Sequence, residues 1–285
     1  MPTSDNQIKA LIRLLSDEDE RIASTICGKL VEIGDSAIPL LLEAEIEQPE
    51  MARRIERVLD EIRGGRLEHE FRELVDTSDE RVDLERGAFL IARYGHSNLD
   101  VDTYAAQLDG LAHEVRDRIG LRVSGEEAVK TLNRYLFSEQ GFRGNTKNYY
   151  EADNSYLNRV LDRRTGIPIS LSTLYLLIGW RLGLPIHGVG MPGHFLVKYD
   201  SDRYKIFVDC FNGGALLTER ECARFLMQAG YGFEERYLQK STVRAILVRT
   251  MKNLIAIYSK TEDPIKAARL TRFIEVLEGA GEAPA

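Results

Sequence analysis

The sequence predicts an α+β protein in which a helix packs on an antiparallel sheet, with helical segments on both sides of that core. Apolar residues recur at helical spacing over residues 1–65 and again over 241–277. β-branched and aromatic residues gather instead in residues 186–199 and 204–211, as in strands. With 285 residues, of which 44% are hydrophobic, the chain is long enough to bury a large core.

The first segment, residues 1–65, has a weak internal repeat. A shift of 29 positions places Leu11 on Leu40, Ile26 on Ile55 and Leu30 on Leu59. This period is similar to two HEAT-like helical repeats, and an unrelated four-helix cap with ordinary amphipathic spacing is the alternative. In either case we expect residues 1–65 to pack or bind rather than catalyse, and to end at the two consecutive glycines 64 and 65.

Residues 66–145 predict a helical lead-in to the core. Helical spacing occupies residues 71–74, 79–94 and 101–119, with glycines directly after the second and third stretches. Ser124 and Glu127 form a capping-box pattern before the apolar residues of 128–137. Another helix is therefore expected to begin at Ser124.

Residues 146–240 predict the α+β core. Pro168 suits the first turn of a helix that runs to Leu182 and stops at Gly183. The two strand-like segments follow, and a second capping box, Thr218 with Glu221, opens a helix over 222–228. Residues 241–285 predict a tail of two amphipathic helices, broken at 262–264.

Composition excludes several classes of protein. The net charge of −7, from 38 Lys and Arg against 45 Asp and Glu, argues against a nucleic-acid-binding surface. Cys27, Cys210 and Cys222 match no zinc or redox spacing, which favours a reducing compartment. The longest apolar stretch, residues 167–180, is too short to cross a bilayer, and no leader pattern is visible. We expect a cytoplasmic protein without a cofactor or a membrane partner.

A hairpin centred on residues 201 and 202 would pair residues whose numbers sum to 403. His194 then lies directly opposite Asp209, while Phe195 pairs with Val208 and Val197 with residue 206 on an apolar face. The imidazole and the carboxylate would share one face, close enough for a hydrogen bond. Such a pair suits a histidine that acts as a general base. The alternative is that the hydrogen-bonded pair has a purely structural role.

The nucleophile that a base would serve is not evident. Ser170, in the first turn of the helix that follows Gly166, is the best-placed hydroxyl, and capping of that helix is its alternative role. Cys210 follows Asp209 and is expected to point to the opposite, apolar face as a buried thiol. A metal held by His194, Asp209 and Cys210 would need ligands from both faces of one strand, which disfavours a metal site.

Several ordered motifs together resemble the SirB family of bacterial transglutaminase-like proteins, over about residues 80–275 with a tail similar to tetratricopeptide repeats. The motifs occupy residues 154–158, 163–171, 183–184, 192–196 and 209–214. The resemblance implies a papain- and transglutaminase-type core with His194 as the family histidine and Asp209 as the aspartate. It also brings Asn154, Tyr156 and Asn212 forward as candidate binding residues, with core packing as the alternative for Tyr156.

The family's cysteine nucleophile falls on Pro168, which cannot attack a substrate. We therefore expect a non-catalytic scaffold that binds a protein or peptide. The alternative is a hydrolase or acyltransferase with Ser170 as nucleophile, His194 as base and Asp209 as the residue that orients the imidazole. Whether the protein is an enzyme stays open at this point, because a hydroxyl is a poorer nucleophile than a thiol.

Overall fold

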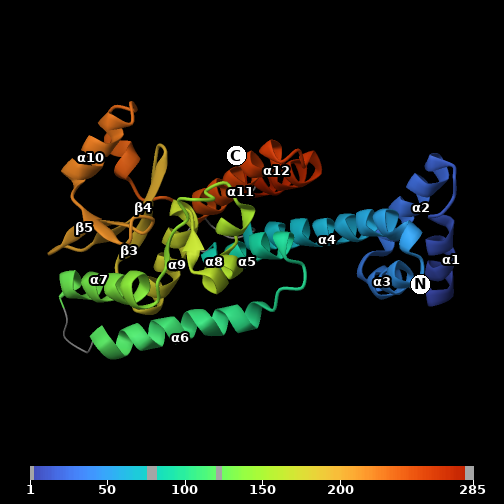
Figure 1. Cartoon of the computed structure of the whole chain (residues 1–285), viewed down its shortest axis with the longest axis horizontal. Helices are drawn as coiled ribbons and strands as arrows, with labels where there is room; N and C mark the ends of the chain where they lie inside the picture. The colour runs from blue at the N-terminus through green and yellow to red at the C-terminus, as the bar shows by residue number, and fades with distance from the viewer. Residues whose placement is uncertain (1–2, 76–81, 120–123, 280–285) are drawn as a thin grey trace, which may run out of the picture. The chain divides into compact units, whose positions relative to one another are not determined.

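The computed structural model describes residues 3–75, 82–119 and 124–279 (Figure 1). The chain divides into two compact units, residues 1–70 and residues 71–285. Each unit is described by itself. Among the described residues, no helix combines the length and the apolar composition that crossing a membrane requires.

The first unit is helical. It contains α1 (Asp5–Leu14), α2 (Glu20–Ile33), α3 (Ile38–Glu47) and the start of α4 (Ala52–Val75), with short 3-10 turns at Gly34–Ala37 and Pro49–Met51. Its core is a cluster of buried aliphatic side chains from all four helices. Asp19 caps α2 by accepting a hydrogen bond from the Arg21 N–H.

The break expected at Gly64 and Gly65 is absent, because α4 runs through both glycines to Val75. Neither glycine adopts a positive φ angle. The apolar residues before and after them, such as Ile62 and Leu67, stay buried at helical spacing. Burial of that stripe outweighs the intrinsic cost of two helical glycines, about 1 kcal/mol each.

The second unit begins with helices that surround a buried one. They are α5 (Leu84–Gly95), α6 (Val101–Ile119), α7 (Gly125–Asn133), a π-helical turn (Arg134–Glu139), a 3-10 turn (Ala152–Asn154), α8 (Leu157–Arg163) and α9 (Pro168–Arg181). The predicted helix at 101–119 and the Ser124 cap are confirmed. The predicted start at residue 79 lies outside the described residues.

Helix α9 is the centre of the second unit. Every residue from Pro168 to Gly179 is buried, as expected of a helix that is apolar on all sides. Pro168 occupies its first turn, and Gly183 follows its end with a φ of +72°, so both sequence signals are confirmed. The helix packs against α6, α11 and strands β3 and β4.

The main sheet has four antiparallel strands in the order β3-β4-β5-β6. They are β3 (Ile186–Met191), β4 (His194–Asp200), β5 (Lys205–Asp209) and β6 (Ala215–Leu217). The segment 186–199 forms two of these strands, because Pro192 and Gly193, with a φ of +73°, make a tight turn between them. A separate parallel pair joins β1 (Arg143–Gly144) to β2 (Thr165–Gly166). The short strand β6 has no counterpart in the sequence prediction.

The predicted register of β4 and β5 is wrong by two residues. Val197 pairs with Val208 and Tyr199 with Ile206, so that paired numbers sum to 405. The cause is the turn, which closes between Ser201 and Tyr204: the Ser201 N–H donates to the Tyr204 carbonyl at 3.0 Å. A shift of two residues leaves every side chain on its predicted face, because side chains alternate with a period of two.

The chain ends with helices α10 (Glu219–Gln228), α11 (Val243–Lys260) and α12 (Pro264–Gly279), with a 3-10 turn at Glu235–Leu238. Thr218 and Glu221 form the predicted capping box of α10. The two tail helices are confirmed, and α11 packs against α12, as seen in the red part of Figure 1.

Candidate functional site

The two faces of the main sheet have different partners. Leu196 and Phe207 lie in a cluster with Cys222 and Leu226 of α10, which covers one face. Phe195 and Val197 alternate with Leu196 and therefore point to the other face, where α9 packs on β4. His194 and Asp209 share the face covered by α10.

His194 and Asp209 form a buried pair. The His194 Nε2 lies 2.8 Å from Asp209 Oδ2, and the two side chains are only 9% and 8% exposed. In the observed register Asp209 falls opposite Leu196, so the predicted direct pairing with His194 is wrong. The two are diagonal neighbours on one face, and their side chains reach across the diagonal, so the predicted hydrogen bond is present.

The loop after β5 holds the Asp209 carboxylate in place. Oδ1 accepts the N–H groups of Phe211 and Asn212 at 3.1 Å each, and the Asn212 side-chain amide donates to Oδ2 at 2.8 Å. Gly213 and Gly214, both with positive φ, let the chain fold back so that the Gly214 N–H reaches the Asp209 carbonyl. Asn212 thus supports the pair, at an exposed position.

The surroundings lower the pKa of Asp209. Burial alone would raise it, but the hydrogen bond and charge of His194, together with the hydrogen bonds of Asn212, outweigh that effect. The carboxylate is therefore the stable form, and it can orient the imidazole through Nε2. The other ring nitrogen, Nδ1, has no hydrogen-bond partner among the described residues.

Aromatic rings, rather than a nucleophile, lie beside the imidazole. The ring centroid of Phe225 is 5.5 Å from that of His194, and Phe211 stands edge-on at 6.4 Å. The Phe211 ring also lies against Gly144 of β1, where an added Cβ would come within 2.6 Å of it. The ring of Tyr149 lies next to that of Phe211, with the two ring centroids 5.9 Å apart.

Ser170 does not reach His194. Its hydroxyl donates to the Asn154 carbonyl at 2.6 Å and accepts the N–H of Ile167 at 3.0 Å. The side chain is buried and satisfies the start of α9, which is the capping role considered from the sequence. No hydrogen bond joins it to the imidazole in the described part of the chain.

The thiols are buried as well. Cys210 follows Asp209 on the α9 face with no exposed surface, and burial raises its pKa well above the ordinary range. Cys222 of α10 is equally enclosed, and burial raises its pKa to about 12. Neither makes a hydrogen bond to His194 within the described residues, so the prediction of Cys210 as a buried thiol is confirmed.

Asn154 and Tyr156, expected as binding residues, lie in the core instead. The Asn154 side chain is fully buried and holds the loop before it, accepting from Asn145 and donating to the Asn148 carbonyl. The Tyr156 hydroxyl lies 2.7 Å from that of Tyr258, and burial raises its pKa. Both side chains are buried, and their polar atoms form hydrogen bonds with other residues of the protein. In this structure they are therefore not accessible to a ligand.

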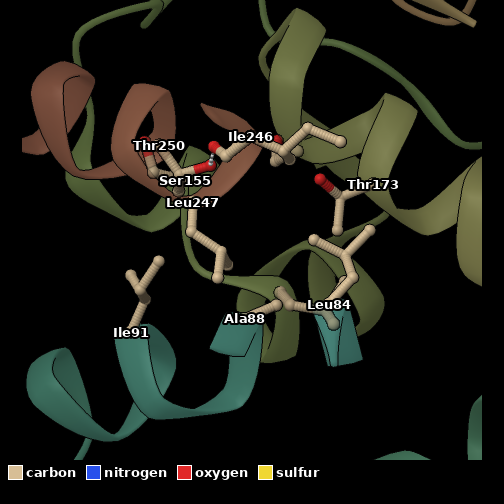
Figure 2. Close-up of a pocket in the computed structure, with 10 residues that line it drawn as sticks. Leu84, Ala88, Ile91, Ser155, Thr173, Ile246, Leu247 and Thr250 are labelled. Carbon is tan, nitrogen blue, oxygen red and sulfur yellow. Dashed lines mark hydrogen bonds between the residues drawn. The ribbon is translucent and has the colours of Figure 1, made fainter. Parts of the chain in front are cut away.

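A small cavity lies elsewhere in the second unit, between α5, α9 and α11 (Figure 2). Apolar side chains such as Leu84 and Ile91 line it together with the hydroxyls of Ser155 and Thr173. The Ser155 hydroxyl has no hydrogen-bond partner among the residues that the structure describes. The space left for the centre of a water molecule is about 10 Å³, which suits one water and no larger ligand.

Sequence reasoning missed two residues near His194. Phe211 gave no signal, since it sits in a loop next to glycines. Arg249 did give a sequence signal, because its positive charge interrupts the largely apolar residues 246–251 of α11. Its Nη2 donates to the carbonyls of Met191 and His194, at 2.8 and 2.9 Å. Within the described residues, no group of three His, Cys, Asp or Glu side chains is arranged to hold a metal ion.

Comparison with known proteins gives a consistent assignment. The family model described as the transglutaminase-like superfamily matches residues 102–252. A UPF0162 protein of Xylella fastidiosa (strain Temecula1) is 35% identical over 218 residues, which cover 74% of this chain and 77% of that protein. The UPF0162 protein of Vibrio cholerae is 28% identical over 141 residues, covering 49% of this chain and 52% of its own.

A mammalian protein is also similar to part of this chain. F-box only protein 21 of Mus musculus is 35% identical over 144 residues, which cover 46% of this chain and 22% of that protein. No solved structure matches the chain. Because the family model covers more than half of the sequence and the Xylella protein aligns with about three quarters of it, this chain belongs to the transglutaminase-like superfamily.

Proposed function

We propose that this protein is a non-catalytic transglutaminase-like protein that binds a protein or peptide segment and acts as a regulatory scaffold. The observation that carries the proposal is the environment of His194: its neighbours are the rings of Phe211 and Phe225. A base without a nucleophile within reach cannot start acyl transfer.

No candidate position supplies a nucleophile to the imidazole. By the resemblance described above, Pro168 falls where the family has its cysteine. Cys222, on the same face of the sheet as His194, is fully enclosed, and burial raises the pKa of its thiol to about 12. The Ser170 hydroxyl is engaged by Asn154 and Ile167 in the interior, where no substrate carbonyl can approach it. Cys210 lies on the opposite face of the sheet from the imidazole, and burial keeps its thiol protonated.

The surface around the pair supports a binding role. Tyr150 is 60% exposed and Phe225 is 39% exposed, although both are large rings. Aromatic residues are enriched at the centres of protein interfaces, because they bury much area with few rotatable bonds. F-box only protein 21 carries a similar region as about a fifth of its length, which is consistent with a module that works within larger assemblies.

The test is capture of peptides by the full-length protein. A library of short synthetic peptides is passed over the immobilised protein, and retained peptides are identified by mass spectrometry. We expect a defined subset to be retained and recovered chemically unchanged.

The His194→Ala variant is the matched control. Cleaved, deamidated or cross-linked peptides that appear with the wild-type protein and vanish with this variant would contradict the proposal and restore the Ser170 hydrolase. The absence of any retained peptide would contradict it as well.

Three finer assignments belong to the same proposal. The motifs named above favour the SirB-type branch of the superfamily. The paired helices at the two ends favour HEAT-like and tetratricopeptide-like segments, which present extended binding surfaces. The cysteine spacing favours the cytoplasm.

A further inference from the structure

Arg249 of α11 is a partly buried cation without a carboxylate partner among the described residues. Burial lowers the pKa of its guanidinium, and the neighbouring Tyr149 is the only group that opposes this effect. Arg181, another partly buried arginine, binds both Glu85 and Asp109. An unpaired charge in such a position is costly, so its retention calls for a reason.

The Arg249 guanidinium is held through Nη2 and by the Phe195 ring, whose centroid lies 5.5 Å from Cζ. Nη2 donates to two carbonyls at the turn between β3 and β4, which fixes the plane of the group. Nε and Nη1 have no hydrogen-bond partner in the described part of the chain, and neither is a fully enclosed orphan atom. A guanidinium with N–H groups left over and its orientation fixed is preorganised for an oxyanion.

Aromatic rings frame this cation and connect it to His194. Burial raises the pKa of Tyr149, and the charge of Arg249 acts against that rise. Tyr149 contacts Phe211, and Phe211 contacts His194. The unpaired charge therefore belongs to the surface proposed above for binding.

A second cation lies on the same stripe of α11. Lys260 is eleven residues after Arg249, which is three helical turns and about 16 Å along one face. Its ammonium lies 3.5 Å from the ring centroid of Tyr150 and pairs with no carboxylate among the described residues. Asn253 and Ala256 occupy the stripe between the two cations.

We infer that Arg249 receives a carboxylate of an acidic peptide segment, with Lys260 as a second, weaker contact and Tyr149 and Tyr150 against the intervening residues. The ligand is thus a peptide bearing Asp or Glu side chains in extended form. Arg249 and Lys260 place two positive charges on one stripe of α11, and these charges are complementary to those of an acidic peptide. This inference rests on the proposed function and specifies its ligand.

The experiment uses the full-length protein and the synthetic peptide library. Retained peptides are sequenced, and each is compared by fluorescence anisotropy with a twin in which Asp and Glu are replaced by Asn and Gln. We expect acidic peptides to be enriched and their twins to bind about 10-fold more weakly or worse. Arg249→Gln should abolish the difference between a peptide and its twin.

Three further variants keep the test independent of folding. Lys260→Gln changes an exposed side chain and should weaken acidic peptides about threefold. Lys252→Gln is the matched control, since it removes one charge from the same helix at an exposed position that pairs with Glu278 at 3.8 Å. It should leave peptide binding unchanged. Arg249→Lys should restore part of the preference for acidic peptides.

The outcomes separate the two proposals. If peptides are retained without any preference for acidic residues, or if Arg249→Gln leaves that preference intact in a folded protein, the inference about Arg249 is wrong and the binding function stands. If no peptide is retained, both fall.

Discussion

The two faces of the β3–β6 sheet differ in what they bury. On the face toward α9, Phe195, Val197, Val208 and Cys210 are at most 1% exposed and form a continuous apolar core. On the face toward α10, the same strands carry a buried hydrogen-bonded pair, His194 and Asp209, next to rings that are partly open to solvent. Both faces bury apolar side chains, and the α10 face also encloses a hydrogen-bonded polar pair.

This difference explains why adjacent residues cannot cooperate. Asp209 and Cys210 are neighbours in sequence, yet alternation along β5 sends one carboxylate to the α10 face and the thiol to the α9 face. The sheet therefore separates the only thiol near the pair in sequence from the imidazole. Proximity along a strand is no evidence for a shared site.

The largest expected effect concerns the α9 face. Phe195→Ala should lower the free energy of unfolding by about 4 kcal/mol, because a fully buried ring leaves a cavity. Phe225→Ala on the other face should cost about 1 kcal/mol, since that ring is partly exposed already. Chemical denaturation of the two variants measures the contrast. Equal losses would mean that the two faces are packed alike.

A change within the ion pair should rank second. Asp209→Asn should cost about 3 kcal/mol at neutral pH, because His194 loses its charged partner and two N–H groups lose a strong acceptor. The measurement is again denaturant unfolding. A loss below about 0.5 kcal/mol would show that the pair contributes little and that the α10 face tolerates its absence.

The same pair should have a defined acid dependence. The pKa of Asp209 is lower in the folded protein than the ordinary 3.8, so the unfolded chain binds its proton first as the pH falls. Its contribution is complete above pH 3.8 and is lost as the pH drops through the depressed folded value. The stability gap between wild type and Asp209→Asn should therefore narrow in acid. If the stability difference between wild type and Asp209→Asn widened toward low pH, the pKa of Asp209 would have to be raised by folding and not lowered.

A smaller effect is expected at the start of α9. Ser170→Ala should lower the unfolding free energy by about 1.5 kcal/mol, because the Ile167 N–H and the Asn154 carbonyl lose a buried partner. Peptide binding by the folded variant should be unchanged, as anisotropy titration can show. Loss of a chemical activity with unchanged stability would instead identify Ser170 as a nucleophile.

The smallest effect should come from Cys210→Ala, about 1 kcal/mol, for the loss of a small buried side chain. Thermal unfolding measures it, with peptide binding as the second readout. In the native protein an alkylating reagent should leave Cys210 unmodified, since no part of the residue is exposed. Rapid alkylation would mean that the α9 face opens.

The sequence was most informative where the local signals were strong. Pro168, Gly183 and the Thr218 capping box placed helix ends correctly, because such signals act within one turn. The helix end predicted at Gly64 and Gly65 was wrong, because burial of the apolar residues on either side keeps α4 continuous through both glycines. The hairpin register failed for a related reason: one hydroxyl, that of Ser201, closed a wider turn than the spacing suggested.

Two factors placed the site residues: the alternation of side chains along the strands, and the contacts that form between distant segments on folding. The sequence by itself determined that His194 and Asp209 share one face and that Cys210 faces the other, because a period of two survives any even shift of register. Only the tertiary structure decided that the Ser170 hydroxyl donates to the Asn154 carbonyl, that Asn154 and Tyr156 are interior, and that the Phe211 ring lies beside the imidazole. These outcomes depend on contacts between segments far apart in the chain, which no local pattern encodes.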